Sequence, residues 1–287
     1  MHNTRKFKVY CLAIKTILEE ILINRSKKDL IYLLYYRIRN WGDAINPIFT
    51  SMLTSKKIVK LDIDAVRILH SLYNNKIKYL GIGSIIEHAD ENTIIWGSGL
   101  QGKKILTRSP LKIHAVRGPL TAKALKYSGI NCPNIYGDPG LLFPLFYKPK
   151  KIVKKYKLGI ACHISDVNNN NIVTFKKNKE IKIISMRKTS LELIDDINEC
   201  ENIISTSLHG LILGDAYQIP TFWGKISDKI PGKDFKFHDY HASLGLEIAK
   251  PLIINDKINL NDMIKKCTKR EVNLDLQKLL ESSPYKH

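Results

Sequence analysis

Residues 202–220 read NIISTSLHGLILGDAYQIP, a stretch whose pattern changes twice. An apolar run leads into a cluster of small hydroxyl residues, and His209 follows directly. A helical stretch punctuated by glycine then continues to Gln218, and Pro220 closes it. This pattern predicts a strand, a tight turn and a helix, with His209 in the first helical turn.

The start of that predicted helix is suited to an anion. The first N–H groups of a helix lack partners and lie at the positive end of its dipole. Hydroxyl groups at the cap add donors, and a histidine in the same turn can move a proton near neutral pH. We therefore expect an anionic ligand beside an acid/base group, with Ser205, Thr206, Ser207, Leu208 and His209 as candidates.

Strand-like apolar runs alternate with helical stretches along the whole chain, which is typical of parallel sheets built from βαβ units. We expect an α/β fold of two lobes, with ligands bound in the cleft beyond the carboxyl ends of the strands. The strands are expected at 31–38, 77–83, 93–97, 113–116, 134–137, 157–163 and 181–186, and helices at 117–129 and 190–200.

The charged, proline-marked residues 148–157, KPKKIVKKYK, are typical of a linker. We expect an N-terminal lobe over 1–147 and a C-terminal lobe over 148–257. A polar helical tail over 258–287 is expected to pack back across the lobes.

The N-terminus begins basic and then turns apolar, as a signal peptide does, but Lys15, Glu19 and Glu20 interrupt the apolar part. An amphipathic helix is the better interpretation. No apolar run approaches the roughly 18–20 residues of a membrane span. The five cysteines form no C-x-x-C pair, so a reducing cytoplasm is expected, with neither disulfides nor a zinc site.

The formal charge of +19 has two interpretations. It points to an anionic partner, or it reflects the Lys, Ile and Asn richness of a low-GC genome. No zinc finger, recognition helix or aromatic RNA-binding signature supports nucleic acid as the partner. Peripheral contact with anionic lipid at the inner face of the cytoplasmic membrane stays open as a secondary role.

Two glycine loops follow predicted strands in the first lobe. NWGD (40–43) suits a loop facing the cleft or a simple helix cap. WGSG (96–99) lacks the G-x-G-x-x-G spacing of a dinucleotide site, and a tight turn explains it equally well. The candidate cleft residues here are Asn40, Gly42, Asp43, Gly97 and Ser98.

Arg117 follows a predicted strand and opens a helix, where its guanidinium can bind a carboxylate or phosphate. A surface arginine there would oppose the positive helix end, so a bound anion is favoured. Asp138, in the turn GDPG, faces the cleft in one interpretation and is selected by turn chemistry alone in the other.

Two further groups lie in the second lobe. His163 ends a predicted strand, and nearby Asp166 could orient it as a base, although polar surface is an alternative. Lys236, Asp239 and Tyr240 cluster on a predicted loop that suits polyol or phosphate binding, or simply solvent.

Taken in order, NWGD, WGSG, AVRGPLT (115–121), YGDPGLL (136–142), CHISD (162–166), the stretch 202–220 and KFHDY (236–240) resemble the polysaccharide pyruvyltransferase family. The resemblance implies two Rossmann-like lobes similar to GT-B glycosyltransferases, with no metal or cofactor required. It also implies transfer of the carboxyethylidene unit of phosphoenolpyruvate to two hydroxyls of a sugar. The product is a cyclic pyruvate ketal on a bacterial surface polysaccharide or its lipid-linked precursor, and phosphate is released.

The resemblance also implies site residues. The family's helix-opening arginine corresponds to Arg117, and an Arg-Leu-His triplet to Ser207-Leu208-His209, with serine in place of arginine. Lys236 or another lysine is a candidate for the missing positive charge. We expect His209 to act as the acid and His163 as the base, with Arg117 binding phosphoenolpyruvate.

Two other functions stay open. A glycosyltransferase that uses a nucleotide sugar would share the architecture, because fold does not fix function. A non-catalytic basic protein that binds anionic membrane or nucleic acid would share the charge.

Overall fold

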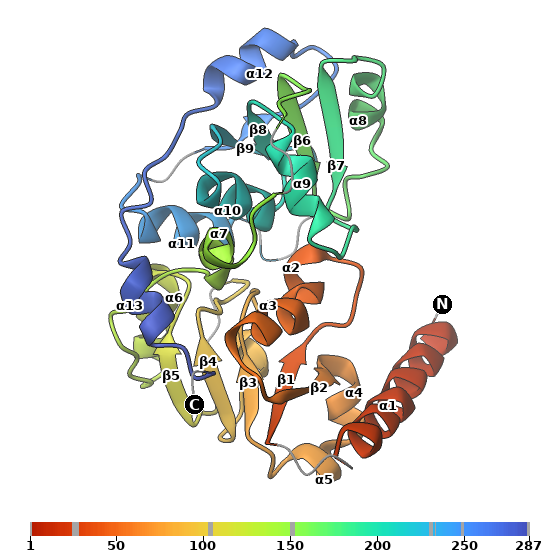
Figure 1. The fold of residues 1–287 in the computed structure, drawn as a ribbon, viewed down its shortest axis with the longest axis vertical. Coiled ribbons are helices and arrows are strands. Elements are labelled where there is room, and N and C mark those ends of the chain that lie inside the picture. The colour runs from red at the N-terminus through yellow and green to blue at the C-terminus, as the bar shows by residue number, and fades with distance from the viewer. Residues whose placement is uncertain are drawn as a thin grey trace.

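The chain forms two parallel five-stranded β-sheets, one above the other in Figure 1. The computed structural model describes residues 2–24, 29–102, 106–149, 153–229, 232, 234–247 and 250–285. The first sheet has the order β2-β1-β3-β4-β5 and the second β10-β9-β8-β6-β7. The strands are β1 (Leu30–Tyr35), β2 (Lys57–Asp62), β3 (Lys78–Leu80), β4 (Thr93–Trp96), β5 (Lys112–Ala115), β6 (Leu158–Cys162), β7 (Ile181–Ser185), β8 (Ile203–Ser205), β9 (Thr221–Lys225) and β10 (Leu252–Ile253).

Both sheets have the same topology. In each, the first strand along the chain lies between the second and the third, and the fourth and fifth follow outward. The direction in which successive strands are added to the sheet therefore reverses between β1 and β3 in one lobe and between β6 and β8 in the other. The central strands β1 and β6 are almost wholly buried, as parallel strands covered on both faces are. The predicted pair of Rossmann-like lobes is confirmed.

Helices cover the sheets and fill the space between them (Figure 1). The first lobe carries α1 (His2–Asn24), α2 (Trp41–Ala44), α3 (Asn46–Leu53), α4 (Ile63–Ile68), α5 (His70–Tyr73), α6 (Pro119–Tyr127), α7 (Phe143–Phe146) and the 3₁₀ turns η1 (Ile86–His88) and η2 (Pro139–Leu142). The rest of the chain carries α8 (Asn170–Phe175), α9 (Glu192–Asn198), α10 (Leu208–Ala216), α11 (Phe235–Ser243), α12 (Leu260–Lys266) and α13 (Leu276–Glu281). No helix within the described ranges is both long and apolar enough to cross a bilayer.

The stretch 202–220 folds as predicted, with β8, a turn and α10 in succession. Gly210 allows α10 to approach the strand, because a Cβ there would lie 2.2 Å from the Oγ of Ser205. His209 lies in the first turn of the helix, as expected.

Several local predictions are wrong. Residues 41–43 lie in helix α2 instead of a loop, and only Asn40, the N-cap residue, has an extended backbone. Residues 134–137 form no strand, only a single bridge between Val116 and Tyr136. Residues 236–240 lie within helix α11. Strand β2 was missed because it lies at the sheet edge, where lysines interrupt its apolar pattern.

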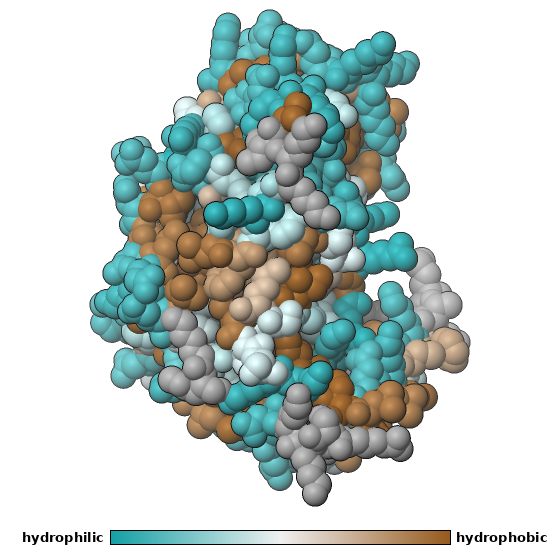
Figure 2. All heavy atoms as spheres, viewed as in Figure 1, coloured by the Kyte–Doolittle hydropathy of each residue, from teal (hydrophilic) through white to brown (hydrophobic). Residues whose placement is uncertain are grey.

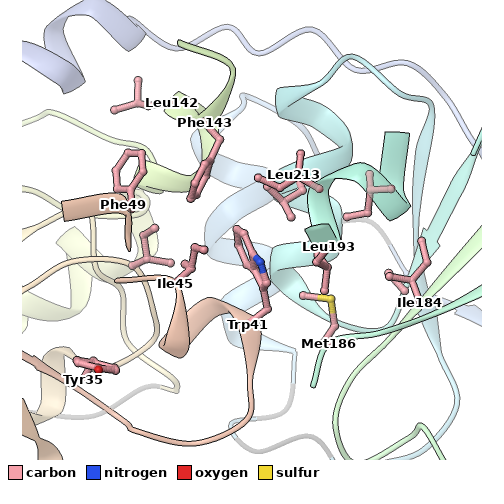
Figure 3. Packing of buried hydrophobic residues seen from close by; sticks show 14 of the residues in the cluster. Tyr35, Trp41, Ile45, Phe49, Leu142, Phe143, Ile184, Met186, Leu193 and Leu213 are labelled. Carbon is pink, nitrogen blue, oxygen red and sulfur yellow. The ribbon is translucent and has the colours of Figure 1, made fainter. Parts of the chain in front are cut away.

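One hydrophobic core joins the lobes. Trp41, Ile45 and Phe49 of the first lobe pack in the same cluster as Met186 and Leu193 of the second (Figure 3). The Trp41 indole also donates to the carbonyl of Ser190 at 3.0 Å, and its backbone N–H donates to Met186 at 2.8 Å. The two lobes therefore meet through an apolar contact.

The C-terminal segment contacts both lobes. Met263 of α12 is buried in the core of the second sheet, and the indole of Trp96 in the first lobe donates to the carbonyl of Leu279 in α13 at 3.0 Å. Part of the predicted linker, 150–152, lies outside the described residues. The division of the chain at 147 and 257 stays a prediction.

Candidate active site

A cleft of about 180 Å³ lies between the lobes, where the two reversals of strand order face each other. Ligands of parallel α/β sheets bind at such points because the loops there diverge to opposite faces of the sheet. Segments after β1 and β3 supply one wall and segments after β6 and β8 the other. The lining residues are Tyr36, Ile38, Asn40, Asp43, Gly83, Ser84, Ile85, Gln101, His163, Ile164, Ser207, Leu208, His209 and Lys236.

The start of α10 opens into this cleft. Ser207 is the extended N-cap residue, and its side chain makes no capping hydrogen bond, so the first N–H groups of the helix lack their usual side-chain acceptor. Ser205 and Thr206 are fully buried and shape the turn instead of lining the cleft. The Ser205 hydroxyl donates to the Ser207 carbonyl at 2.7 Å, and that of Thr206 accepts from the His163 N–H at 2.9 Å.

His209 lies on the cleft wall with its Nε2 buried and without a hydrogen-bond partner. The Oδ2 of Asp138, also without a partner, lies 3.8 Å from this nitrogen. Burial, followed by the nearby charges of Lys236 and Arg117, lowers the pKa of His209 to about 3. Burial raises the pKa of Asp138 to about 6. At neutral pH the cleft wall therefore has a neutral imidazole beside a carboxylate.

His163 faces His209 from the end of β6. Its Nδ1 lies 2.8 Å from the Oγ of Ser165. Burial, followed by the charge of Lys236, lowers its pKa to about 4, so its imidazole is neutral near pH 7. The prediction that Asp166 orients this ring is wrong, because the Asp166 carboxylate is buried and accepts from the hydroxyl of Ser227 at 2.6 Å.

Asp43 and Lys236 bring opposite charges to the cleft. Asn40 donates to the Asp43 carboxylate at 2.6 Å, yet burial dominates and raises the pKa of Asp43 to about 7. Burial and the charge of Arg117 lower the pKa of Lys236 to about 8, while Asp43 opposes that shift. Lys236 thus supplies a positive charge to the cleft that Ser207 also lines.

Arg117 and Asp239 do not line the cleft, contrary to the sequence-based expectation. Both side chains are fully buried, and the Arg117 Nε donates to the Asp239 carboxylate at 2.9 Å. The same guanidinium donates to the Ser84 hydroxyl at 2.6 Å, and Thr121 donates to Asp239 from its backbone at 2.8 Å. A Cβ at Gly118 would lie 2.2 Å from the Asp239 carbonyl oxygen, so glycine permits this contact.

Three other candidates are structural. Tyr240 is buried and donates to the carboxylate of Asp215 at 2.8 Å. Ser98 is buried and donates to the Gly83 carbonyl at 2.9 Å. Gly97 has a positive φ of 78° and packs against Pro139, as a tight turn requires. Gly42 lies directly against the His209 ring, outside the cleft lining.

The sequence prediction missed Tyr36, Ser84 and Gln101, whose polar groups line the cleft. Their positions in the sequence, near the ends of predicted strands, could have identified them. Tyr36 comes directly after β1, Ser84 follows the Gly-Ile-Gly that comes after β3, and Gln101 follows the glycine turn after β4. Side chains at the carboxyl ends of parallel strands share one edge of the sheet.

A larger hollow of about 420 Å³ lies elsewhere on the first lobe, between α4 and η1. Charged residues of this hollow form salt bridges with nearby side chains. Arg67 pairs with Asp64 at 3.1 Å and Lys78 pairs with Asp90 at 3.0 Å. The cleft between the lobes, with its unpartnered groups, is the better candidate site. Throughout the part of the chain that the structure describes, no group of three or more His, Cys, Asp or Glu residues could hold a metal ion.

Comparison with known proteins identifies the family. Over 260 residues the chain is 27% identical to uncharacterized protein L143 of Acanthamoeba polyphaga mimivirus, covering 88% of this chain and 85% of that protein. It is 25% identical over 174 residues to succinoglycan biosynthesis protein ExoV of Rhizobium meliloti (strain 1021), covering 58% of this chain and 54% of that protein. No solved structure matches. The model of the polysaccharide pyruvyl transferase family matches residues 25–223, most of the chain, and the protein therefore belongs to this family of transferases.

Proposed function

We propose that this protein transfers the carboxyethylidene group of phosphoenolpyruvate to two hydroxyls of a sugar, with release of phosphate. The acceptor is a surface polysaccharide or its lipid-linked precursor. The observation that carries the proposal is the cleft in which the uncapped start of α10, the ammonium of Lys236 and the imidazole of His209 converge. Two anionic groups on one small molecule match this set of donors.

The donor binds with its phosphate and carboxylate against Ser207, Leu208 and Lys236. Backbone N–H groups and one ammonium hold its charge in fixed positions. Arg117 is buried beneath the cleft lining and does not touch the donor. It holds the Ser84 hydroxyl in position and adds positive charge near Lys236. This replaces the direct arginine contact that the family pattern implies.

His209 protonates the methylene carbon of the donor. Without the donor its pKa is too low for an acid at neutral pH, because burial and the neighbouring cations Lys236 and Arg117 oppose a charge on the ring. An anionic donor reverses that field and raises the pKa of His209, so that the imidazole takes up a proton as the substrate binds. Asp138, within 3.8 Å, then stabilises the imidazolium.

Proton transfer to carbon leaves a cationic centre that still bears the phosphate. A first sugar hydroxyl adds to this centre and loses its proton to His163. The bond to phosphate then breaks, and a second hydroxyl closes the ketal and loses its proton to Asp43, whose pKa of about 7 suits a base. One of the two hydroxyl protons replaces the proton given to carbon, and the other leaves with phosphate, so the atoms balance.

A glycosyltransferase that uses a nucleotide sugar is the second candidate, favoured only by the two-lobed architecture. The match to the polysaccharide pyruvyl transferase family favours pyruvyl transfer over this alternative.

The test is to offer the protein phosphoenolpyruvate or nucleotide sugars together with a panel of glycosides, and to measure phosphate release and product mass. The proposal expects release of inorganic phosphate and an acceptor that has gained one carboxyethylidene unit in place of two hydrogens. A gain of one hexosyl unit from a nucleotide sugar would overturn it.

A further inference from the structure

Helix α1 lies along the edge of the first sheet with only one side against the protein. Ala13 and Thr16 are buried on that side, and the Thr16 hydroxyl lies 3.5 Å from the carbonyl oxygen of Lys60 in the edge strand β2. The helix also packs against α4. One face of α1 is thus fixed to the fold, and the opposite face points outward.

The acidic residues of α1 are used on the inner side. Glu20 accepts hydrogen bonds from the hydroxyls of Tyr32 and Tyr73, each at 2.7 Å. Glu19 pairs with Arg37 at 3.2 Å. Neither carboxylate belongs to the exposed face, although Lys15 lies within 3.9 Å of Glu19.

The outer face carries a continuous apolar stripe. Phe7, Tyr10, Ile14, Leu18 and Leu22 recur at the three- and four-residue spacing that places side chains on one side of a helix, and each is more than half exposed. In Figure 2 hydrophobic residues form a brown band at the lower right, where Figure 1 places this helix.

Positive charge flanks this stripe. Lys8 and Lys15 are the exposed charged side chains along residues 7–23 of α1, and Lys57 and Lys60 are exposed on the neighbouring strand β2. A stripe of large apolar residues bordered by lysines is the pattern of a helix that lies in the surface of an anionic bilayer.

We propose that α1 binds the surface of an anionic lipid bilayer, with its apolar stripe in the headgroup region and its lysines against lipid phosphates. The lysines favour an anionic bilayer over a second copy of the chain as the binding partner, because two such faces would bring like-charged lysines together. This inference does not depend on the transfer reaction.

The test is co-sedimentation of the full chain with vesicles. Vesicles that contain phosphatidylglycerol should bind the protein, those of phosphatidylcholine alone should bind far less, and added salt should weaken binding. The double variant Ile14→Ser/Leu18→Ser should lose about tenfold or more of its partitioning, since two large apolar side chains no longer enter the bilayer. The variant Lys8→Gln/Lys15→Gln should have a weaker preference for anionic lipid than the parent, because Lys57 and Lys60 remain.

The matched control is Leu145→Ser/Val173→Ser, which removes exposed apolar side chains away from α1 and should bind as the parent does. Circular dichroism checks that each variant is folded. Equal binding by the α1 variant and the control would overturn the proposal, as would absence of binding by the parent. Concentration-dependent dimerisation in sedimentation velocity that Ile14→Ser/Leu18→Ser abolishes would assign the stripe to a second copy instead.

Discussion

Gly42 and His209 meet across the junction of the two lobes, so closely that a Cβ on Gly42 would lie 2.0 Å from Nδ1 of the histidine ring. The ring cannot stay in place if residue 42 has a side chain. The glycine of α2 in one lobe therefore sets the position of the imidazole at the start of α10 in the other.

Gly42→Ala should displace the His209 ring and lower kcat/KM for phosphoenolpyruvate by on the order of 100-fold, the cost of misplacing a reacting group by about 1 Å. Gly102→Ala is the control, because its nearest neighbour would be 3.9 Å from the new Cβ. If Gly42→Ala kept full activity, His209 would not need its observed position for the reaction.

His209→Ala should lower kcat by roughly 10²–10⁴, since the reaction loses its general acid. Asp138→Asn should lower kcat less and leave KM for phosphoenolpyruvate nearly unchanged, because the carboxylate touches the imidazole and not the donor. Steady-state phosphate release measures both, with His70→Ala, an exposed histidine, as the control. An unchanged kcat in His209→Ala would remove this residue from the mechanism.

The arrangement of the site was predictable to the extent that single segments determine it. The sequence around His209 specifies a strand, a turn and a helix by local pattern alone, and the structure has all three. The alternation of strands and helices likewise predicts two parallel sheets, whose shared strand order then brings the loops after β1, β3, β6 and β8 together.

The contacts between distant segments were not predictable in the same way. Arg117 and Asp239 are separated by most of the second lobe, and nothing in either local pattern shows that one neutralises the other. A polar residue after a predicted strand or on a predicted loop is expected to be exposed. Arg117 and Asp239 are instead buried, because each is paired with a residue from the other lobe. Tyr240 is buried by a partner within its own lobe, since its hydroxyl donates to Asp215 on another helix, α10.

The buried pair of Arg117 and Asp239 should matter for stability more than for chemistry. Arg117→Met leaves the Asp239 charge buried without its counter-ion and should reduce the free energy of unfolding by about 3–5 kcal/mol. The double variant Arg117→Met/Asp239→Asn should lose less than the sum of the two single variants, because neither charge then remains unpaired. Urea denaturation measures all three, and additive losses would contradict the pairing.

Lys236 should make donor binding depend on pH in a defined direction. Burial, followed by the charge of Arg117, lowers the pKa of Lys236 to about 8, so the ammonium is present below that pH and is lost above it. Because the anionic donor binds the protonated form, its Kd should rise by about tenfold per pH unit above 8, as linkage to a single proton requires.

Lys236→Arg should keep binding nearly constant to pH 9.5, since a guanidinium stays charged there. Lys236→Met should bind weakly at every pH, whereas Lys229→Met, at an exposed lysine, should behave as the parent does. Calorimetric titration with phosphoenolpyruvate across this range gives the Kd values, and the same pH dependence in Lys236→Met as in the parent would show that another group holds the donor's charge.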